Sequence, residues 1–166
     1  MRSLLAATAC AAMLMACGQP AEAPPAPAGE PAGSAAPAAV ADGPDIAEMQ
    51  AAVAALPAPY NAASYENGQR VFAQCRSCHT IGAGEPNRVG PNLHGIFGRE
   101  IGSVQGFTYS NAVQEANFAW DPAQLENWLA NPQSFLPGNR MAFAGVRDET
   151  QRRDIIAYLL IETAAE

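Results

Sequence analysis

The chain contains no lysine: all nine of its basic residues are arginines, set against sixteen acidic residues for a net charge of −7. A net acidic chain of this kind argues against nucleic acid as a partner. Histidine is also scarce, with two among 166 residues, and only two of the four cysteines lie beyond the N-terminal apolar segment. No disulfide framework can therefore stabilise the later part of the chain, whose length suits one modest domain with extensions.

The N-terminal segment is too short to span a membrane. Its apolar run, residues 4–16, follows a single positive charge and has the length of a signal-peptide core, whereas a span needs about 20 apolar residues. We predict a signal peptide over residues 1–16. The segment ends in Leu-Met-Ala-Cys17, which resembles the lipobox of bacterial lipoproteins and implies lipidation of Cys17. The alternative is an ordinary signal peptide in which Cys17 is incidental, and either version exports the chain.

The region that follows, residues 17–59, is predicted to be a linker. Residues 18–43 are almost entirely Ala, Pro, Gly and Glu, a composition that buries too little apolar surface to fold. Where extended, such a spacer rises about 3.1 Å per residue, so we expect it to act as a leash on the domain that follows. Residues 45–56 have apolar residues at helical spacing, and prolines follow. This pattern leaves open a helix packed on the domain or a weak helix within the linker.

The central motif is Cys75-Arg-Ser-Cys78-His79, the C-x-x-C-H pattern of c-type haem attachment. Two thiols at this spacing can form thioethers with the two vinyl groups of one porphyrin. The adjacent imidazole is then held against one face of the iron as an axial ligand. Half a zinc site would need another Cys/His pair, and a thioredoxin-like redox pair would sit near a βαβ pattern. Neither accompaniment is visible in the sequence.

Three helices are predicted in the domain from residue 60 to the C-terminus. The first begins near Ser64, or near Asn67, and approaches the haem motif; its Gly68 would let another helix come close. The second begins at Asp121-Pro122 and ends at Pro132. The third covers residues 149–162 and has an apolar band wide enough to pack on the first near Phe72. The glycine-rich stretch 82–106 reads as long loops, which a bound haem would organise.

A second axial ligand is sought among few residues. Met141 is the only methionine after the haem motif, and it lies in a turn-forming stretch that could present a thioether inward. An ordinary core methionine is the competing interpretation. His94 is the rival ligand, although a surface or structural imidazole suits its position, fifteen residues after His79, better. On these observations alone the choice stays open.

From about residue 64 to 163 the chain resembles the class I, mitochondrial-type cytochromes c, including bacterial c2-like relatives. The matching segments are CRSCHT at 75–80, VGPNLHGIFGR at 89–99, GFTYSNA at 106–112, Trp120, NPQSFLPGNRMAFAGV at 131–146 and RRDIIAYLL at 152–160. The resemblance implies an all-α fold, with three main helices and long loops around one covalently bound haem c.

The resemblance also implies roles for individual residues. Its axial ligands would be His79 and Met141, with the Pro91 carbonyl accepting a hydrogen bond from the other His79 nitrogen. Three further positions match residues that surround a buried haem propionate in the family: Arg99, Tyr109 and Trp120. Two positions depart from the family pattern. Trp128 stands where a tyrosine is usual, and Asn139 stands where threonine is frequent, so the reduction potential is not implied.

These features predict a one-electron carrier rather than an enzyme, since two axial ligands leave no open site for substrate. By resemblance it would be a monomer that takes electrons from a quinol:cytochrome c oxidoreductase and delivers them to a terminal oxidase or a photosynthetic reaction centre. We expect it on the periplasmic side of a bacterial membrane, anchored by lipid, or else soluble in the periplasm. Alternatives are a fixed haem subunit of a larger oxidase or dehydrogenase, and a weak peroxidase if methionine ligation is lost. Arg76, Arg88 and Arg140 fall near the expected haem edge and could form a small basic docking patch.

Overall fold

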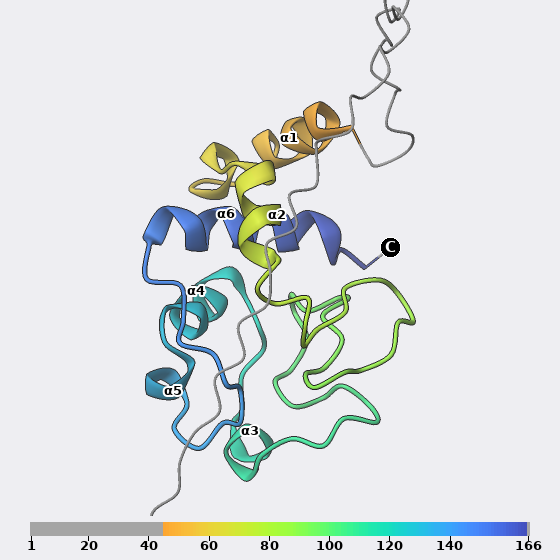
Figure 1. Ribbon diagram of the computed structural model, residues 1–166, viewed down its shortest axis with the longest axis vertical. Coiled ribbons are helices and arrows are strands. Elements are labelled where there is room, and N and C mark those ends of the chain that lie inside the picture. Colours follow the sequence, from red (N-terminus) through yellow and green to blue (C-terminus); the bar gives the residue numbers. More distant parts are fainter. Residues whose placement is uncertain (1–44, 166) are drawn as a thin grey trace, which may run out of the picture. The chain divides into compact units, whose positions relative to one another are not determined.

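A computed structural model of the protein describes residues 45–165. Their elements, in chain order, are α1 (Ile46–Ala54), a 3₁₀ turn η1 (Tyr60–Ala62), α2 (Tyr65–Phe72), α3 (Asn111–Glu115), α4 (Pro122–Ala130), α5 (Pro132–Phe135) and α6 (Glu149–Glu162). Within this described part the chain forms no strand, and its extended segments meet only in an isolated antiparallel bridge between Glu100 and Ala119. The expected all-α fold is confirmed. Long loops join the helices on one side (Figure 1).

Helices α2 and α6 cross in the core, as the sequence predicts (Figure 1). Gly68 lies at the crossing, where a methyl group would overlap the Asp154 carbonyl and meet the Cβ of Tyr158. The rings of Phe72 and Tyr158 pack next to it, with centroids 5.3 Å apart. The glycine is therefore required by close approach of the two helices and not by its backbone conformation.

Asp154 joins α6 to the start of α2. Asp154 is 2% exposed. It accepts hydrogen bonds from the Ser64 backbone N–H at 3.0 Å and from Asn67 Nδ2 at 2.7 Å. Ser64 Oγ in turn accepts from the Asn67 N–H, so Ser64 is the N-cap, as its position suggests. Two polar groups at this helix start, the Ser64 N–H and the Asn67 side-chain amide, are thus satisfied across the crossing, where the local sequence would leave them to water.

We expect Gly68→Ala to lower the free energy of unfolding by about 1–3 kcal/mol, the usual cost of overpacking. The methyl group would meet backbone atoms of α6, which cannot move without separating the two helices. Urea denaturation of the holoprotein measures the loss. Gly82→Ala is the matched control, because the atoms near its added methyl belong to the flexible Glu85 side chain. Equal losses at the two positions would contradict the role of Gly68 in the crossing.

Helix α1 packs on the domain, which decides between the two placements that the sequence left open. Val53 is fully buried, and Met49 and Leu56 pack against the same core. The Gln50 side chain donates to the Ala63 carbonyl at 2.9 Å and accepts from the Tyr65 N–H at 2.8 Å. The expected start of the domain at residue 60 is therefore too late, because α1 packs against α2 and α6 and Gln50 bonds to the start of α2.

Helix α4 begins and ends as predicted. Asp121 caps it by accepting from the Gln124 N–H at 2.6 Å, and its apolar face buries Leu125, Trp128 and Leu129. The one-turn helix α5 and the short α3 were not expected, since four or five residues carry no readable periodicity. Residues 73–110 contain no helix, in agreement with the predicted loops. Across residues 45–165, none of the helices has the length and apolar character needed to cross a bilayer.

Candidate cofactor site

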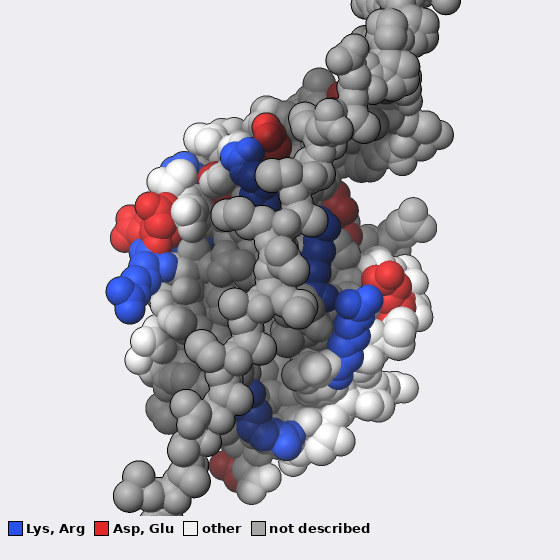
Figure 2. Space-filling view, in the orientation of Figure 1, with Lys and Arg blue, Asp and Glu red and all other residues white. Residues whose placement is uncertain are grey.

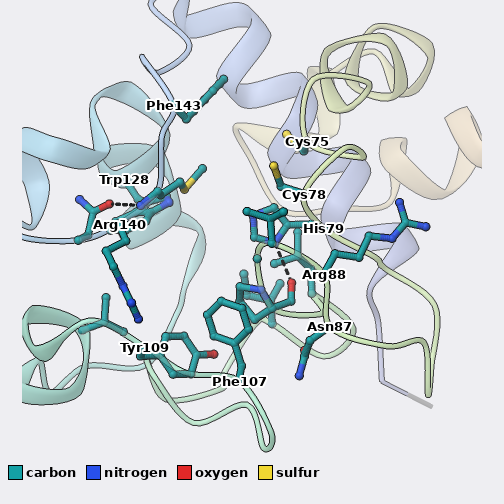
Figure 3. A pocket seen from close by; sticks show the side chains of 18 of the residues that line it. Cys75, Cys78, His79, Asn87, Arg88, Phe107, Tyr109, Trp128, Arg140 and Phe143 are labelled. Atoms are coloured by element: carbon teal, nitrogen blue, oxygen red, sulfur yellow. Dashed lines mark hydrogen bonds between the residues drawn. The ribbon is translucent and has the colours of Figure 1, made fainter.

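The domain encloses a cavity of about 780 Å³ between the loops and helices α4 and α6. Both cysteines of the central motif, His79 and Met141 are among the residues that line it. Figure 3 shows Cys75, Cys78 and His79 together on one side, Trp128 and Arg140 on the other, and Tyr109 and Phe107 between them. The structure thus brings Cys75 and Met141, which are 66 positions apart in the chain, to the lining of one cavity.

His79 is oriented by its backbone neighbours. Its Nδ1 lies 2.7 Å from the Pro91 carbonyl oxygen (Figure 3). Because a carbonyl only accepts, Nδ1 carries the proton and Nε2 keeps a free lone pair. Burial lowers the pKa of His79, and the hydrogen bond to Pro91 opposes this shift, so the ring is neutral at pH 7. Gly90 is packed against the ring, where a side chain would overlap it. The arrangement presents an imidazole nitrogen suited to binding a metal.

The two motif cysteines are free and half-buried. Burial, with a smaller contribution from Cys78, raises the pKa of Cys75 to about 11, so its sulfur is a thiol at neutral pH. Among residues 45–165 there is no group of three or more His, Cys, Asp and Glu side chains that could hold a metal ion. Two thiols beside a largely apolar cavity fit attachment of an organic group.

Arg99 and Tyr109 both line the cavity. The Arg99 guanidinium donates to the carbonyls of His94 at 2.7 Å and Asn92 at 3.0 Å. Burial lowers the pKa of Arg99, and Tyr109 acts against that shift; burial also raises the pKa of Tyr109. The sequence-predicted neighbours Trp120 and Trp128 are buried in the cavity wall, in edge contact with ring centroids 5.4 Å apart. A guanidinium and a phenol in this part of the wall suit an anionic group on a bound cofactor.

Met141 and His94 are placed differently. Met141 lines the cavity, with its backbone N–H donating to Asn139 Oδ1 at 2.9 Å. His94 is absent from the residues around that cavity; its backbone N–H donates to Asn92 Oδ1 and its carbonyl accepts from Arg99. The sequence alone could not separate these candidates. Only the thioether is available on the cavity side.

Comparison with known proteins agrees with this site. The family model "Cytochrome c" matches residues 65–161, more than half of the chain. The chain belongs to the cytochrome c family. A cytochrome c of Kluyveromyces lactis is 43% identical over 106 residues, which cover 63% of this chain and 96% of the relative. A cytochrome c2 of Blastochloris viridis is 42% identical over 107 residues, covering 64% and 84% of the two chains. A cytochrome c-550 of Ancylobacter novellus is 44% identical over 95 residues, covering 55% and 89%.

Membership in the cytochrome c family identifies the protein as a haem-based electron carrier and its cofactor as haem c, attached covalently through cysteines. The residues fit that group: Cys75 and Cys78 offer two thiols, and a neutral His79 stands beside them. Bound there, haem c supplies a one-electron redox centre in a cavity that the protein shields from water. The cofactor that the central motif predicts and the fold that the resemblance implies are thus confirmed.

Sequence reasoning noted Asn139 only as a departure from the family pattern and did not predict the group of side chains that supports the Met141 segment of this cytochrome. The side chains of Gln133, Asn139 and Arg152 hold the segment that carries Met141. Arg152, 8% exposed, donates to the carbonyls of Val146 and Arg147 and forms an ion pair with Glu126 at 2.6 Å. The one available signal was Arg152, an arginine on the face of the last helix that was expected to be buried. A search for periodic hydrophobic residues does not register a charged residue at such a position.

Proposed function

We propose that the protein is a membrane-tethered, one-electron carrier whose haem c is ligated by His79 and Met141. The supporting observation is that the imidazole and the only methionine after the haem motif line one cavity. A thioether and an imidazole together would fill both axial positions and favour a raised reduction potential. With no open position for a substrate, electron exchange is the reaction that this ligand set supports.

Its partners would be a quinol:cytochrome c oxidoreductase as donor and a terminal oxidase or photosynthetic reaction centre as acceptor. The relative named cytochrome c2 supports a place in such a chain of redox proteins. Docking would use the exposed side of the cavity, where three exposed arginines lie at or beside its lining: Arg76, Arg88 and Arg140. Figure 2 shows basic side chains on both sides of the central part of one face and most acidic ones near its outline. An acidic partner surface suits this distribution.

The remaining parts of the proposal concern residues 1–44, which lie outside the described residues. We propose that residues 1–16 are a signal peptide, that Cys17 is lipidated, and that the Ala/Pro-rich segment after it is the leash. Export is consistent with the cofactor, because haem is attached to C-x-x-C-H outside the cytoplasm in bacteria. The carrier would then work on the periplasmic side of the membrane at a high local concentration.

We expect Cys17→Ser to release the holoprotein from the membrane fraction and to slow its quinol-dependent reduction by membrane vesicles. The variant should regain the wild-type rate when it is added in excess, because only its local concentration has changed. Stopped-flow absorbance at the haem bands measures both rates. Retention of Cys17→Ser in fixed stoichiometry with one complex would contradict a mobile carrier. Failure of the released wild-type domain to be reduced at any concentration would contradict the proposed donor.

A further inference from the structure

The side-chain amide of Asn139 makes four hydrogen bonds, all to residues between positions 132 and 141. Its Nδ2 donates to the carbonyls of Pro132 and Leu136, each at 2.8 Å. Its Oδ1 accepts from the Met141 backbone N–H at 2.9 Å and from Gln133 Nε2 at 3.2 Å. Asn139 is 7% exposed, so water cannot readily replace these partners.

The orientation of this amide is determined by its neighbours. Nitrogen faces two carbonyl oxygens and oxygen faces two N–H groups, so the reversed orientation would leave every contact repulsive. Neither a carboxylate nor a hydroxyl could make the same set, since the first has no donor and the second has one. Asparagine is therefore matched to this place.

Gln133 completes the support of Met141. Its Nε2 donates to the Met141 carbonyl at 3.0 Å. Met141 lies in neither a helix nor a strand. Its backbone N–H and carbonyl are nevertheless both bound, by the side chains of Asn139 and Gln133 respectively. Further along, the Val146 N–H donates to the Leu129 carbonyl at 2.7 Å, which fixes the far end of the segment to α4.

From these contacts we infer that Asn139, assisted by Gln133, is the positioning residue that keeps the Met141 thioether in the cofactor cavity. The inference rests on the proposed ligation by Met141 and adds how that ligand is retained. Without the amide, the backbone of Met141 loses its nearest support while the far end of the segment stays attached. The thioether would then leave the haem iron more often, and a small external ligand could take the position.

The test uses Asn139→Asp in the ferric holoprotein, with imidazole as the external ligand. Asp keeps the shape of the side chain but turns an oxygen toward the Pro132 and Leu136 carbonyls. A buried group left unsatisfied costs about 1–3 kcal/mol, so we expect the apparent affinity for imidazole to rise roughly tenfold or more. The methionine-to-iron charge-transfer band should weaken in parallel.

Asn92→Asp is the matched control on the histidine side of the cavity. The Asn92 side-chain amide also makes several hydrogen bonds. Its Nδ2 donates to Thr80 Oγ1 at 2.8 Å and to the Gly82 carbonyl at 3.0 Å, and its Oδ1 accepts from the His94 N–H. Its substitution removes two donors in the same way and should lower the urea midpoint, but should leave imidazole affinity at the wild-type value. Equal gains in imidazole affinity for both variants would overturn the inference, because they would indicate loosening of the whole fold.

A second pair of variants avoids buried positions. Gln133→Ala, at an exposed residue, should raise imidazole affinity less than Asn139→Asp does. Gln114→Ala also truncates an exposed glutamine, removing one hydrogen bond to the Tyr109 carbonyl at 3.2 Å where Gln133→Ala removes two, and should have no effect. Unchanged affinity in both Asn139→Asp and Gln133→Ala would overturn the positioning role. Failure of the ligation proposal has a different signature: the wild-type protein would lack the charge-transfer band and Met141→Ala would not alter imidazole binding.

Discussion

The Met141→Ala holoprotein is expected to lose the methionine-to-iron charge-transfer band of the ferric state completely and to bind carbon monoxide in the ferrous state. Met141 lines the cofactor cavity, and His94, the competing ligand of the sequence, does not. Removing the thioether would vacate one axial position, because no second methionine follows the haem motif in the chain. Near-infrared and visible spectra of purified protein measure both changes.

The reduction potential of Met141→Ala should fall as well. Methionine–histidine ligation raises the potential, and axial ligands span roughly 0.8 V across haem proteins, so a drop on the order of 100 mV is expected. Met49→Ala is the matched control, since Met49 packs against the core from α1 without lining the cavity. That variant should lose stability and keep both the band and the potential. An intact band in Met141→Ala would rule out the proposed ligation.

The Cys75→Ala/Cys78→Ala double variant is expected to lose the covalent cofactor entirely and, with it, the fold. A cavity of about 780 Å³ would remain unfilled. At about 24 cal/mol per Å³, an empty cavity of that size costs roughly 19 kcal/mol, more than the 5–15 kcal/mol by which domains are usually stable. Water entering the cavity reduces this figure, but the apolar wall would still be left without its packing partner.

Haem staining after denaturing electrophoresis measures covalent attachment, and far-ultraviolet circular dichroism measures helix content. Ser77→Ala, between the two cysteines, is the control; Ser77 is an exposed residue whose hydroxyl donates to Cys78 Sγ at 3.6 Å. It should retain haem and helices. A double variant that kept native helix content without haem would show that the core formed by α2, α4 and α6 is sufficient by itself.

The cofactor and the helical framework could be predicted from the sequence because both are local in origin. Cysteines two residues apart with an adjoining histidine define an attachment site wherever the chain folds. Ser64 and Asp121 cap helices through N–H groups within three residues of themselves, so their effect is readable from spacing. Gly68 could also be read from the local sequence. It is the one small residue on an apolar helix face, and so it marks the place where another helix can approach closely.

The residues that position the ligands could be decided only by the tertiary structure. Whether α1 belongs to the domain depends on Val53 and Gln50 meeting chain segments that the helix pattern of residues 45–56 does not specify. The proposal of Met141 over His94 rests on which of them lines a cavity built by distant loops. The sequence marks Asn139 only as a departure from the family pattern, and its proposed role comes from four hydrogen-bond partners brought together around the α5 turn. Polar groups buried in loops are satisfied by neighbours in space, and no spacing rule along the chain specifies those neighbours.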